Sequence, residues 1–350
     1  METKNQVVVV IGASGGLGSE IARTFSKAGE RIVLAARDTA KLTSLANELN
    51  ASTYIVDITN LASVEALRNE VMRNYGHMDV VINATGYYVR KAFEQHTAED
   101  LRRTVDVNLL GVMNITHAFV RDMSDGVIAH LGGFADGRLS FPYYAADAAS
   151  RAGVASFAEA MNRELRLEGR SVTLLYFSPS PADTDAERSF HELWRQMGTK
   201  IVPTERVAAE LRRAVIQKRK QYVMGGMLVS GFAKLNAAFP NLADALMMNK
   251  YGKKLQSFFG KAAGMDTKSS LALRAGLGMV IFSVALYGVI FSLPFFPIST
   301  ANKLALTPVL MVVSEIVFWV GGALAGRDVV SRYRSYLDPR EWCKPKKEAS

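Results

Sequence analysis

Val7-Val-Val-Val-Ile-Gly-Ala-Ser-Gly-Gly-Leu-Gly18 is the stretch that decides the fold. Its first five residues form a β-branched apolar run, which is typical of a strand buried in a parallel sheet. A glycine-rich turn and an amphipathic helix follow, and this order places a phosphate on the free N–H groups of a helix N-terminus. The stretch therefore predicts a dinucleotide site whose cofactor-binding residues are Gly12, Ser14, Gly15, Gly16, Leu17 and Gly18.

Glycine suits this turn, because a Cβ atom would block both the tight turn and the close approach of a pyrophosphate. Their spacing is Gly-x-x-x-Gly-x-Gly, whereas most dinucleotide domains carry Gly-x-Gly-x-x-Gly. Taken alone, the turn is also compatible with an ordinary strand-to-helix connection that has spare glycines.

The composition describes a basic chain with an apolar excess. The 350 residues are enough for one large domain and an appendage, 49% of them are hydrophobic, and the formal net charge is +9. A basic balance suits nucleic acid or an anionic membrane surface. We expect a membrane and no nucleic acid, because the apolar excess lies towards the C-terminus and the sequence shows no platform of aromatic and basic residues.

Two observations concern the cellular compartment. Cys343 is the only cysteine of the sequence, which excludes an intramolecular disulfide and fits a reducing compartment. The first predicted strand begins about six residues from the start of the sequence, which leaves no room for a signal peptide. We expect no bound metal.

Strands and helices alternate along residues 1–225. Predicted strands cover 7–11, 31–36, 53–56, 79–83, 126–131 and 172–177, and helices lie between them, including 98–119 and 145–168. This alternation predicts an α/β domain with a Rossmann-like, doubly wound parallel sheet.

Arg37 ends the second predicted strand, which in a dinucleotide fold points at the adenosine ribose. An acidic residue here would accept hydrogen bonds from the 2′-hydroxyl group, whereas an arginine pairs with a 2′-phosphate. Arg37 therefore favours NADP over NAD. The alternative is a solvated arginine at a strand end.

Residues 5 to about 225 resemble the short-chain dehydrogenase/reductase family. The family's TGxxxGxG motif matches Gly12, Gly16 and Gly18, with Ile11 in place of the threonine. Its other motifs match Asp57, Asn83-Ala84-Thr85-Gly86, Asn108 and the segment from Pro179 to Thr184, in which Ser180 replaces a glycine. The resemblance implies a nicotinamide cofactor held in part by Asp57, Asn83, Ala84, Gly86 and Thr184, and a structural and catalytic role for Asn108.

The resemblance fails at the catalytic set. The family uses Ser, Tyr and Lys; the Tyr exchanges a proton with the carbonyl group, and the Lys four residues later lowers the pKa of that Tyr and binds the nicotinamide ribose. Two anchors, Pro142 and Glu164-Leu165, agree in placing Asp147 at the Tyr position and Arg151 at the Lys position. The Ser position falls at or near Gly133, which has no side chain.

Asp147 and Arg151 are expected to pair, because residues four apart share one face of a helix. A paired aspartate is a poor proton donor at neutral pH, since a neighbouring cation lowers its pKa. Arg151 is no equivalent of Lys but remains a cation that could hold the ribose. Tyr144 could supply a phenol after a local rearrangement; His130 is a further candidate, although a strand-end histidine is more often satisfied by its neighbours. The candidate catalytic residues are Asn108, Asp147, Arg151 and Tyr144.

Residues 226–270 form an amphipathic apolar extension that is rich in methionine. Such a segment suits an adaptable apolar surface or a membrane interface. Its layout resembles the C-terminal extension of family members that act on steroids, long-chain ketones or sphingoid bases. A subunit interface or a lid over the core is the alternative.

Two long apolar stretches follow, and about 20 apolar residues span a bilayer as a helix. Residues 275–296 carry no charge, and residues 304–325 carry only Glu315, which is costly inside a membrane and is either structural or functional there. We predict a transmembrane helical hairpin at 271–326, with two buried helices of a soluble domain as the alternative. By the positive-inside rule, the flanking basic residues place the nucleotide domain and the tail 327–350 on the cytoplasmic side.

The sequence supports three hypotheses about function. The first is a membrane-anchored oxidoreductase that transfers hydride between NADP(H) and a lipophilic carbonyl or alcohol, with membrane lipid as a further partner. The second is a catalytically impaired relative that binds NADP(H) as a sensor or scaffold, which would explain Gly133, Asp147 and Arg151. The third, a transporter or channel accessory, is disfavoured because two helices are too few for a pathway unless they oligomerise. A homo-oligomer is compatible with the sequence.

Overall fold

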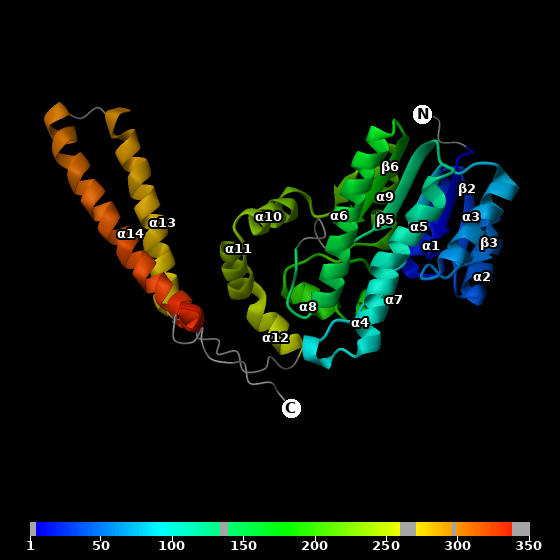
Figure 1. Cartoon of the computed structure of the whole chain (residues 1–350), viewed down its shortest axis with the longest axis horizontal. Helices are drawn as coiled ribbons and strands as arrows, with labels where there is room; N and C mark the ends of the chain where they lie inside the picture. The colour runs from blue at the N-terminus through cyan, green and yellow to red at the C-terminus, as the bar shows by residue number, and fades with distance from the viewer. Residues whose placement is uncertain (1–4, 134–138, 260–270, 296–298, 338–350) are drawn as a thin grey trace. The chain divides into compact units, whose positions relative to one another are not determined.

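The computed structural model describes residues 5–133, 139–259, 271–295 and 299–337, and it divides the chain into two compact units, Met1–Ala262 and Ala263–Ser350. The described part of the first unit contains a seven-stranded sheet in which neighbouring strands are parallel (Figure 1). The strand order is β3-β2-β1-β4-β5-β6-β7. The prediction of a Rossmann-like parallel α/β sheet is therefore confirmed.

The strands follow the apolar runs of the sequence. They are β1 Val7–Ile11, β2 Arg31–Ala36, β3 Ser52–Ile55, β4 Val80–Asn83, β5 Asp125–Leu131, β6 Ser171–Ser178 and β7 Gln221–Val223. The six predicted strands are all present, with ends that differ by no more than one residue. Strand β7 was not predicted, because three residues are too few to show a period.

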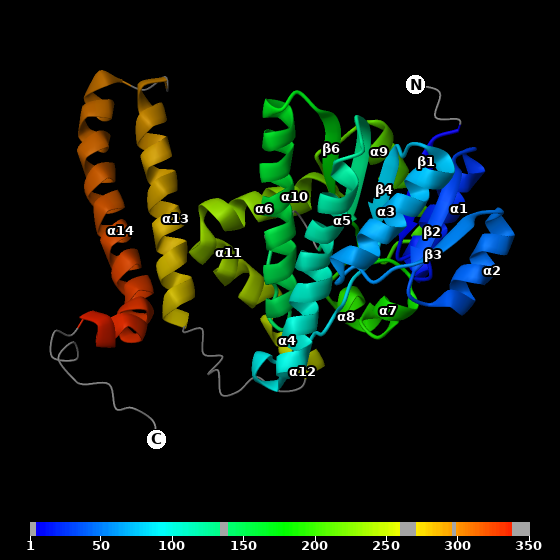
Figure 2. The same cartoon turned by 45° about the vertical axis from the view of Figure 1, so that its right-hand side comes forward.

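Helices cover both faces of the sheet (Figures 1 and 2). On one face lie α1 Gly16–Lys27, α2 Thr39–Leu49 and α9 Thr204–Ile216, whose apolar side chains pack on Val8 and Val10 of β1. On the other face lie α3 Leu61–Tyr75, α5 Gly111–Val120 and α6 Ala145–Leu167, which pack on Val7, Val9 and Ile11. Because successive strand residues point to opposite faces, the continuous β-branched run of β1 serves both cores.

One predicted helix is interrupted. In place of a single helix over 98–119, α4 Ala98–Val105 passes through a π-helical turn at Asp106–Leu110 before α5 begins. The N–H group of Gly111 bonds the carbonyl oxygen of Asp106 across this wider turn, and Asn108 lies buried inside it. Such turns are frequent at functional sites, and one extra residue in a helix leaves too little trace in the apolar period to be predicted.

A third apolar cluster lies beside the sheet, around α8 His191–Gln196 and the helices of the predicted extension. These helices are α10 Gly226–Ala238, α11 Pro240–Met247 and α12 Lys253–Phe259. The cluster is formed by Leu139, Phe141, Tyr144, Leu193, Trp194, Met197, Ala233, Met247 and Leu255. Phe239, which directly precedes α11, and Leu246 on α11 stay 62% and 46% exposed, so this part of the extension keeps an uncovered apolar surface.

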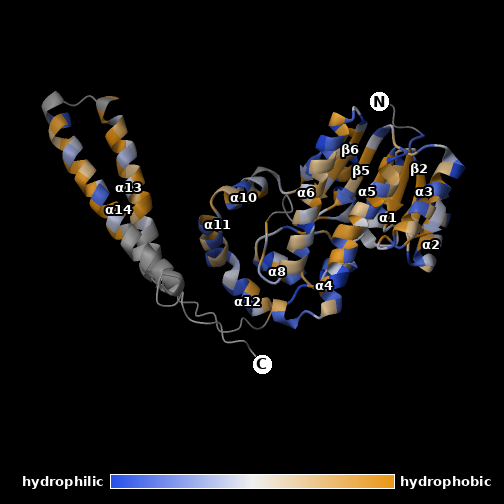
Figure 3. Cartoon of the chain, in the orientation of Figure 1, coloured by the Kyte–Doolittle hydropathy of each residue, from blue (hydrophilic) through white to orange (hydrophobic). Residues whose placement is uncertain are grey.

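The described part of the second unit contains two long helices, α13 Leu271–Ser292 and α14 Thr300–Leu337, which lie side by side (Figures 1 and 2). Ser283 and Ser314 join them through reciprocal hydrogen bonds: the Ser283 Oγ donates to the Ser314 carbonyl oxygen at 2.9 Å, and the Ser314 Oγ donates to the Ser283 carbonyl oxygen at 3.1 Å. Apolar residues predominate along both helices where they are described (Figure 3).

One stretch of the second unit, Asn302–Val320, is long and apolar enough to cross a membrane, with a mean hydropathy of 1.8 over 19 residues. The apolar part of α13 that is described, Gly278–Ser292, is shorter than this. One candidate span is therefore present among the described residues, and a hairpin that crosses twice stays a prediction. Most of the basic tail, from residue 338 onwards, lies outside the described residues, and so does Cys343.

Candidate active site

The glycine turn after β1 leaves the N-terminus of α1 open. A Cβ atom on Gly18 would lie 2.1 Å from the carbonyl oxygen of Gly12, and Gly12 itself has a φ of +88°, so both positions require glycine. The N-cap residue of α1, Gly15, has no side chain that could cap the helix, and the first turn carries no acidic residue. The first N–H groups of α1 are therefore suited to an anionic ligand.

A cavity of about 590 Å³ extends from this turn along the carboxyl ends of the strands. Eleven of the residues predicted from the sequence line it: Ser14, Gly15, Gly16, Leu17, Gly18, Ala84, Gly86, Tyr144, Asp147, Arg151 and Thr184. The carboxyl ends of parallel strands are where such folds bind their ligands. The structure therefore brings most of the predicted site together around one space.

Other predicted residues support this space from outside its lining. Gly12 packs so closely against the next turn that a Cβ atom would lie 2.9 Å from the carbonyl carbon of Ala84. Asn83 holds the same turn, because its Oδ1 accepts hydrogen bonds from the N–H group and the hydroxyl of Thr85 at 3.1 and 2.6 Å. These two residues shape the site.

Arg37 and Asp57 lie at the ends of β2 and β3. Arg37 is exposed, directly before Asp38, which caps α2. Asp57 uses its Oδ1 to accept hydrogen bonds from the N–H group and hydroxyl of Thr59 at 3.0 and 2.8 Å. Lys41, in the first turn of α2, lines the cavity and was missed by the sequence analysis, because a lysine at a helix start is a common surface feature.

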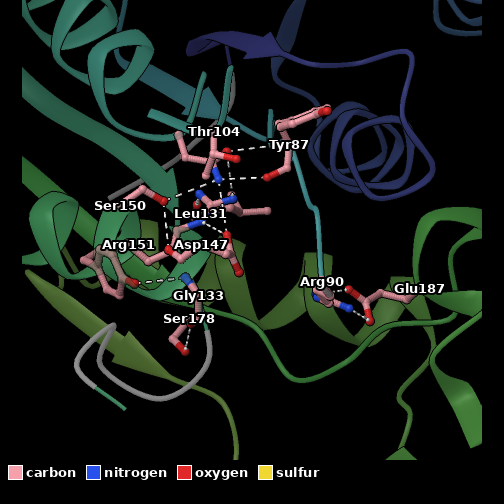
Figure 4. Close-up of polar contacts among 12 residues, drawn as sticks. Tyr87, Arg90, Thr104, Leu131, Gly133, Asp147, Ser150, Arg151, Ser178 and Glu187 are labelled. Atoms are coloured by element: carbon pink, nitrogen blue, oxygen red, sulfur yellow. Dashed lines mark hydrogen bonds and ion pairs between the residues drawn. The ribbon is translucent and has the colours of Figure 1, made fainter. Parts of the chain in front are cut away.

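Asp147 and Arg151 (Figure 4) form a buried polar cluster with Asn108. The pair expected from the sequence is present, with the Arg151 Nε 3.4 Å from the Asp147 Oδ1. Asn108 donates to the same Oδ1 at 3.2 Å, and its own Oδ1 accepts from the backbone N–H group of Tyr87 at 2.8 Å. The guanidinium of Arg151, whose side chain is 2% exposed, also donates to the carbonyl oxygen of Leu131 at 2.9 Å.

Gly133 lies against the side chain of Arg151. A Cβ atom on Gly133 would lie 2.9 Å from the Arg151 Cγ, so a serine at this position would require Arg151 to move. The backbone of Gly133 is held on both sides, since its N–H group donates to the Tyr176 Oη at 2.9 Å and its carbonyl oxygen accepts from the Ser178 Oγ at 2.6 Å. Glycine and arginine at these two positions therefore fit each other.

Arg90 and Glu187 close another wall of the cavity (Figure 4). The two arginine nitrogens Nη1 and Nη2 donate to the Glu187 carboxylate at 3.0 and 2.6 Å, and the side chains are only 6% and 16% exposed. Trp194 donates to the same carboxylate at 3.0 Å. This ion pair could not be predicted from the sequence, because its partners are 97 residues apart.

Tyr144, the phenol proposed from the sequence, lies over Arg90, whose Cζ is 4.8 Å from the ring centroid. The residue is 7% exposed, and its hydroxyl has no hydrogen-bond partner within the described parts of the chain. Burial raises the pKa of Tyr144 to about 12.

His130 is satisfied by its neighbours, as the sequence analysis favoured. Its Nε2 lies 2.8 Å from the Thr116 Oγ1 and its Nδ1 lies 3.4 Å from the Asn83 Nδ2. The residue has no exposed surface, and burial lowers its pKa to about 3. A neutral imidazole inside the sheet is not placed to exchange protons with a ligand in the cavity.

The sequence profile of a known protein family, described as "short chain dehydrogenase", matches residues 6–193. The chain belongs to the short-chain dehydrogenase/reductase (SDR) family. Its relatives include dehydrogenase/reductase SDR family member 7B of Danio rerio, 28% identical over 272 residues that cover 72% of this chain and 87% of the relative. An uncharacterized oxidoreductase of Staphylococcus saprophyticus is 31% identical over 196 residues, 53% of this chain and 81% of the relative.

Solved structures of SDR proteins show the same fold. A short chain dehydrogenase/reductase from Burkholderia phymatum in complex with NAD has a TM-score of 0.61 and 23% identity, and covers 69% of this chain and 96% of its own. One from Burkholderia cenocepacia in complex with NADP has a TM-score of 0.58 and 19% identity, and covers 64% of this chain and 97% of its own. The chain is thus an SDR-type oxidoreductase by family, with a fold that takes NAD or NADP.

Proposed function

We propose that this SDR protein is a membrane-anchored oxidoreductase that transfers hydride between NADP(H) and a lipophilic carbonyl or alcohol. The observation that carries the proposal is the cavity, which joins the glycine turn to an apolar wall formed by Leu139, Phe141 and Trp194. A dinucleotide on the turn and an apolar substrate against this wall would share one space, as hydride transfer requires.

The residues around the glycine turn fit a dinucleotide. The open start of α1 suits the pyrophosphate, and Gly12 and Gly18 leave no room for side chains that would obstruct it. When bound there, NADP(H) supplies or accepts the hydride. Arg37 at the end of β2 and Lys41 at the start of α2 offer two cations for a 2′-phosphate, which supports NADP as the cofactor.

At the far end of the cavity, the chain holds its polar groups in fixed positions. Asn108 is anchored to the backbone of Tyr87 and in turn bonds the carboxylate of Asp147. Asp147 is the acceptor in its contacts with both Asn108 and Arg151, so its carboxylate orients the site and is not the proton donor.

Membrane anchoring is supported by two apolar features. The stretch Asn302–Val320 has the length and composition of a membrane span. In the first unit, the exposed apolar residues Phe239, Leu242 and Leu246 are followed in the chain by exposed Lys250 and Lys253, a combination that suits an anionic lipid surface. We propose a two-span anchor that leaves the nucleotide domain on the cytoplasmic side, and such an anchor also permits a homo-oligomer.

The proposal is tested with detergent-solubilised full-length protein. NADPH and NADH are titrated separately, and long-chain ketones are then added while the absorbance of NADPH is followed. We expect tighter binding of NADPH than of NADH and oxidation of NADPH by at least one ketone. Failure to bind either nucleotide would reject the proposal, and binding without oxidation across a broad lipid panel would reject the enzymatic part.

A second candidate function is a sensor or scaffold that binds NADP(H) at the membrane without turnover. The observation that favours it is the buried cluster of Asp147, Arg151 and Asn108, in which the polar groups at the family's Tyr and Lys positions are occupied with one another. This candidate predicts a change in protease sensitivity or membrane partner on NADPH binding. Rapid reduction of a ketone by the unmodified protein would exclude it.

A further inference from the structure

Among the residues that the structure describes, two phenols line the cavity near Asp147 and Arg151, and only Tyr144 was named from the sequence. The other is Tyr88, in the segment that follows β4. Tyr88 is 43% exposed, whereas Tyr144 is 7% exposed. A group that gives up a proton in each turnover must take one back from solvent, and this requirement favours the more accessible phenol.

The hydroxyl of Tyr88 reaches back over Gly86 towards Arg151. A Cβ atom on Gly86 would lie 2.7 Å from the Tyr88 Oη and 2.9 Å from the Arg151 Nη2, so the phenol oxygen and the guanidinium are near neighbours. The Arg151 Cζ lies 5.5 Å from the centroid of the Tyr88 ring. Burial acts to lower the pKa of Arg151, but Tyr88 and then Asp147 act to raise it, and the net shift is upward.

A second cation lies near the Tyr88 ring. The Cζ of Arg90 lies 5.2 Å from the centroid of the Tyr88 ring, and Arg90 is itself fixed by Glu187. Tyr88 therefore lies within reach of two guanidinium groups that are both held in place by carboxylates. Arg90 acts here as a positioning residue.

Tyr144 is less suited to proton transfer. Its ring packs in the apolar cluster against Phe141, Trp194 and Phe259. The Oη of Tyr88, in contrast, lies beside Arg151, the residue at the position of the family's lysine. A phenol from the segment after β4 and a cation from α6 thus come together where the family takes both groups from one helix.

We propose that Tyr88 is the catalytic proton donor and acceptor of this protein, with Arg151 as the cation beside it. This inference rests on the proposed function. It assigns to Tyr88 the role that Asp147 cannot perform, and it requires the reacting oxygen of the substrate to lie near Gly86, which lines the same cavity.

The step balances as follows in the reductive direction. A hydride passes from the reduced nicotinamide to the carbonyl carbon, and the electron pair of the C=O π bond moves to the oxygen. The O–H bond of Tyr88 breaks, and its proton forms the O–H bond of the product alcohol. The remaining phenolate lies beside Arg151, which stabilises the negative charge, and it takes a proton from water. Oxidation of an alcohol is the reverse.

The first test compares Tyr88→Phe, Tyr144→Phe and Tyr143→Phe in full-length protein, with NADPH and a ketone that the wild type reduces. Tyr143 is the control, because it stacks on Phe259 and is not among the residues of the cavity wall. We expect Tyr88→Phe to lower kcat by about 100-fold or more while the KM for the ketone and the affinity for NADPH stay near the wild-type values. Wild-type kcat in Tyr88→Phe would overturn the inference.

The second test does not depend on turnover. The wild type is nitrated with tetranitromethane in the absence and presence of saturating NADP⁺, and the modified tyrosines are identified by peptide mass spectrometry. We expect NADP⁺ to protect Tyr88 but not Tyr143. Equal nitration of Tyr88 in a protein that demonstrably binds NADP⁺ would overturn the inference and leave the cofactor assignment intact. Absence of nucleotide binding would overturn both proposals.

Discussion

At the scale of the residue, the polar groups of the site form hydrogen bonds and an ion pair with one another. Asp147 and Arg151 are both buried, and Asn108 bonds to each of them. Gly133 lies so near Arg151 that a serine, the residue that the family uses here, would require the arginine to move. Arg151 therefore lies against Gly133 and pairs with Asp147, the residues at the other two positions of the family's catalytic set.

Arg37 provides a prediction about cofactor choice. Replacing Arg37 by Asp should weaken the binding of NADPH by about 10- to 100-fold, because a charge-assisted hydrogen bond to the 2′-phosphate contributes about 1.5–3 kcal/mol. The affinity for NADH should be unchanged or higher, since an aspartate can accept from the ribose hydroxyl. The measurement is a titration of both nucleotides against both proteins. Equal losses for the two nucleotides would show that Arg37 does not contact the 2′-phosphate.

His130 provides a prediction about pH. Burial lowers the folded-state pKa to about 3, so the unfolded chain binds a proton more readily than the folded protein does. The unfolding free energy should therefore fall as the pH drops below about 6.5, by about 1.4 kcal/mol per pH unit. Denaturation curves recorded at a series of pH values, with the protein kept in a mild detergent, give the unfolding free energy and therefore this slope. His130→Gln should be less stable at neutral pH but should lack this contribution to the slope; an identical slope in both proteins would contradict the assignment.

A site residue could be predicted from the sequence where its role follows from residues that are near it in the chain. Gly12, Gly16, Gly18 and the pair Asp147 and Arg151 were identified, because their roles follow from short spacings. Tyr88 and Arg90 were not, because their partners come from α6 and α7 Asp185–Arg188. A contact between distant segments leaves no period or motif in either of them.

At the scale of the element, buried hydrogen bonds and ion pairs join the segments that form the cavity. The π-helical turn aims Asn108 at α6, and the ion pair of Arg90 and Glu187 connects the segment after β4 to α7. The strands themselves were predictable because buried runs of β-branched residues are continuous in the sequence. The π-turn was not, because it changes the helical period by a single residue.

Glu187 provides a prediction at this scale. Glu187→Gln should lower the unfolding free energy by about 3 kcal/mol, since it leaves the buried cation of Arg90 without its carboxylate. It should also raise the KM of the lipophilic substrate, because the wall of the cavity loses its anchor to α7. Thermal unfolding and substrate titration measure the two effects.

The matched control is Glu192→Gln on α8. Glu192 pairs with Arg195 at 2.8 Å, but the two side chains are 55% and 67% exposed. Exposed pairs contribute about 0–1 kcal/mol, so this variant should resemble the wild type in both measurements. A similar loss of stability in the two variants would show that the buried pair has no special role.

At the scale of the whole molecule, the chain combines an SDR domain with a helix pair. The first unit holds the cavity and the second holds Asn302–Val320 and the serine pair. The sequence predicted the first part through its alternating strands and helices and its family motifs, and the second part through the apolar excess in the C-terminal third. Anchoring in a membrane through the second part is a proposal, which the apolar stretch Asn302–Val320 supports.

Truncation tests that role. Protein that ends at residue 262 should no longer resist extraction from membranes by alkaline carbonate, because it lacks the proposed anchor. It should still sediment with vesicles that contain anionic lipid, through Phe239, Leu242 and Leu246, and less so at high salt. Leu242→Asp in the truncated protein should weaken this binding about tenfold or more, while Leu167→Asp, an exposed leucine on α6, should not. Full extraction of the intact chain by carbonate would contradict an integral anchor.

The buried contact between Asp147 and Arg151 also bears on how such a site can arise by descent. A neutral residue in place of Arg151 would leave the buried carboxylate of Asp147 without its ion-pair partner, at a cost of about 3–5 kcal/mol, which is a large share of the stability of most domains. The two positions cannot drift independently. Lineages that carry this aspartate should therefore carry a cation four residues later, and changes at the two sites should be inherited as a pair.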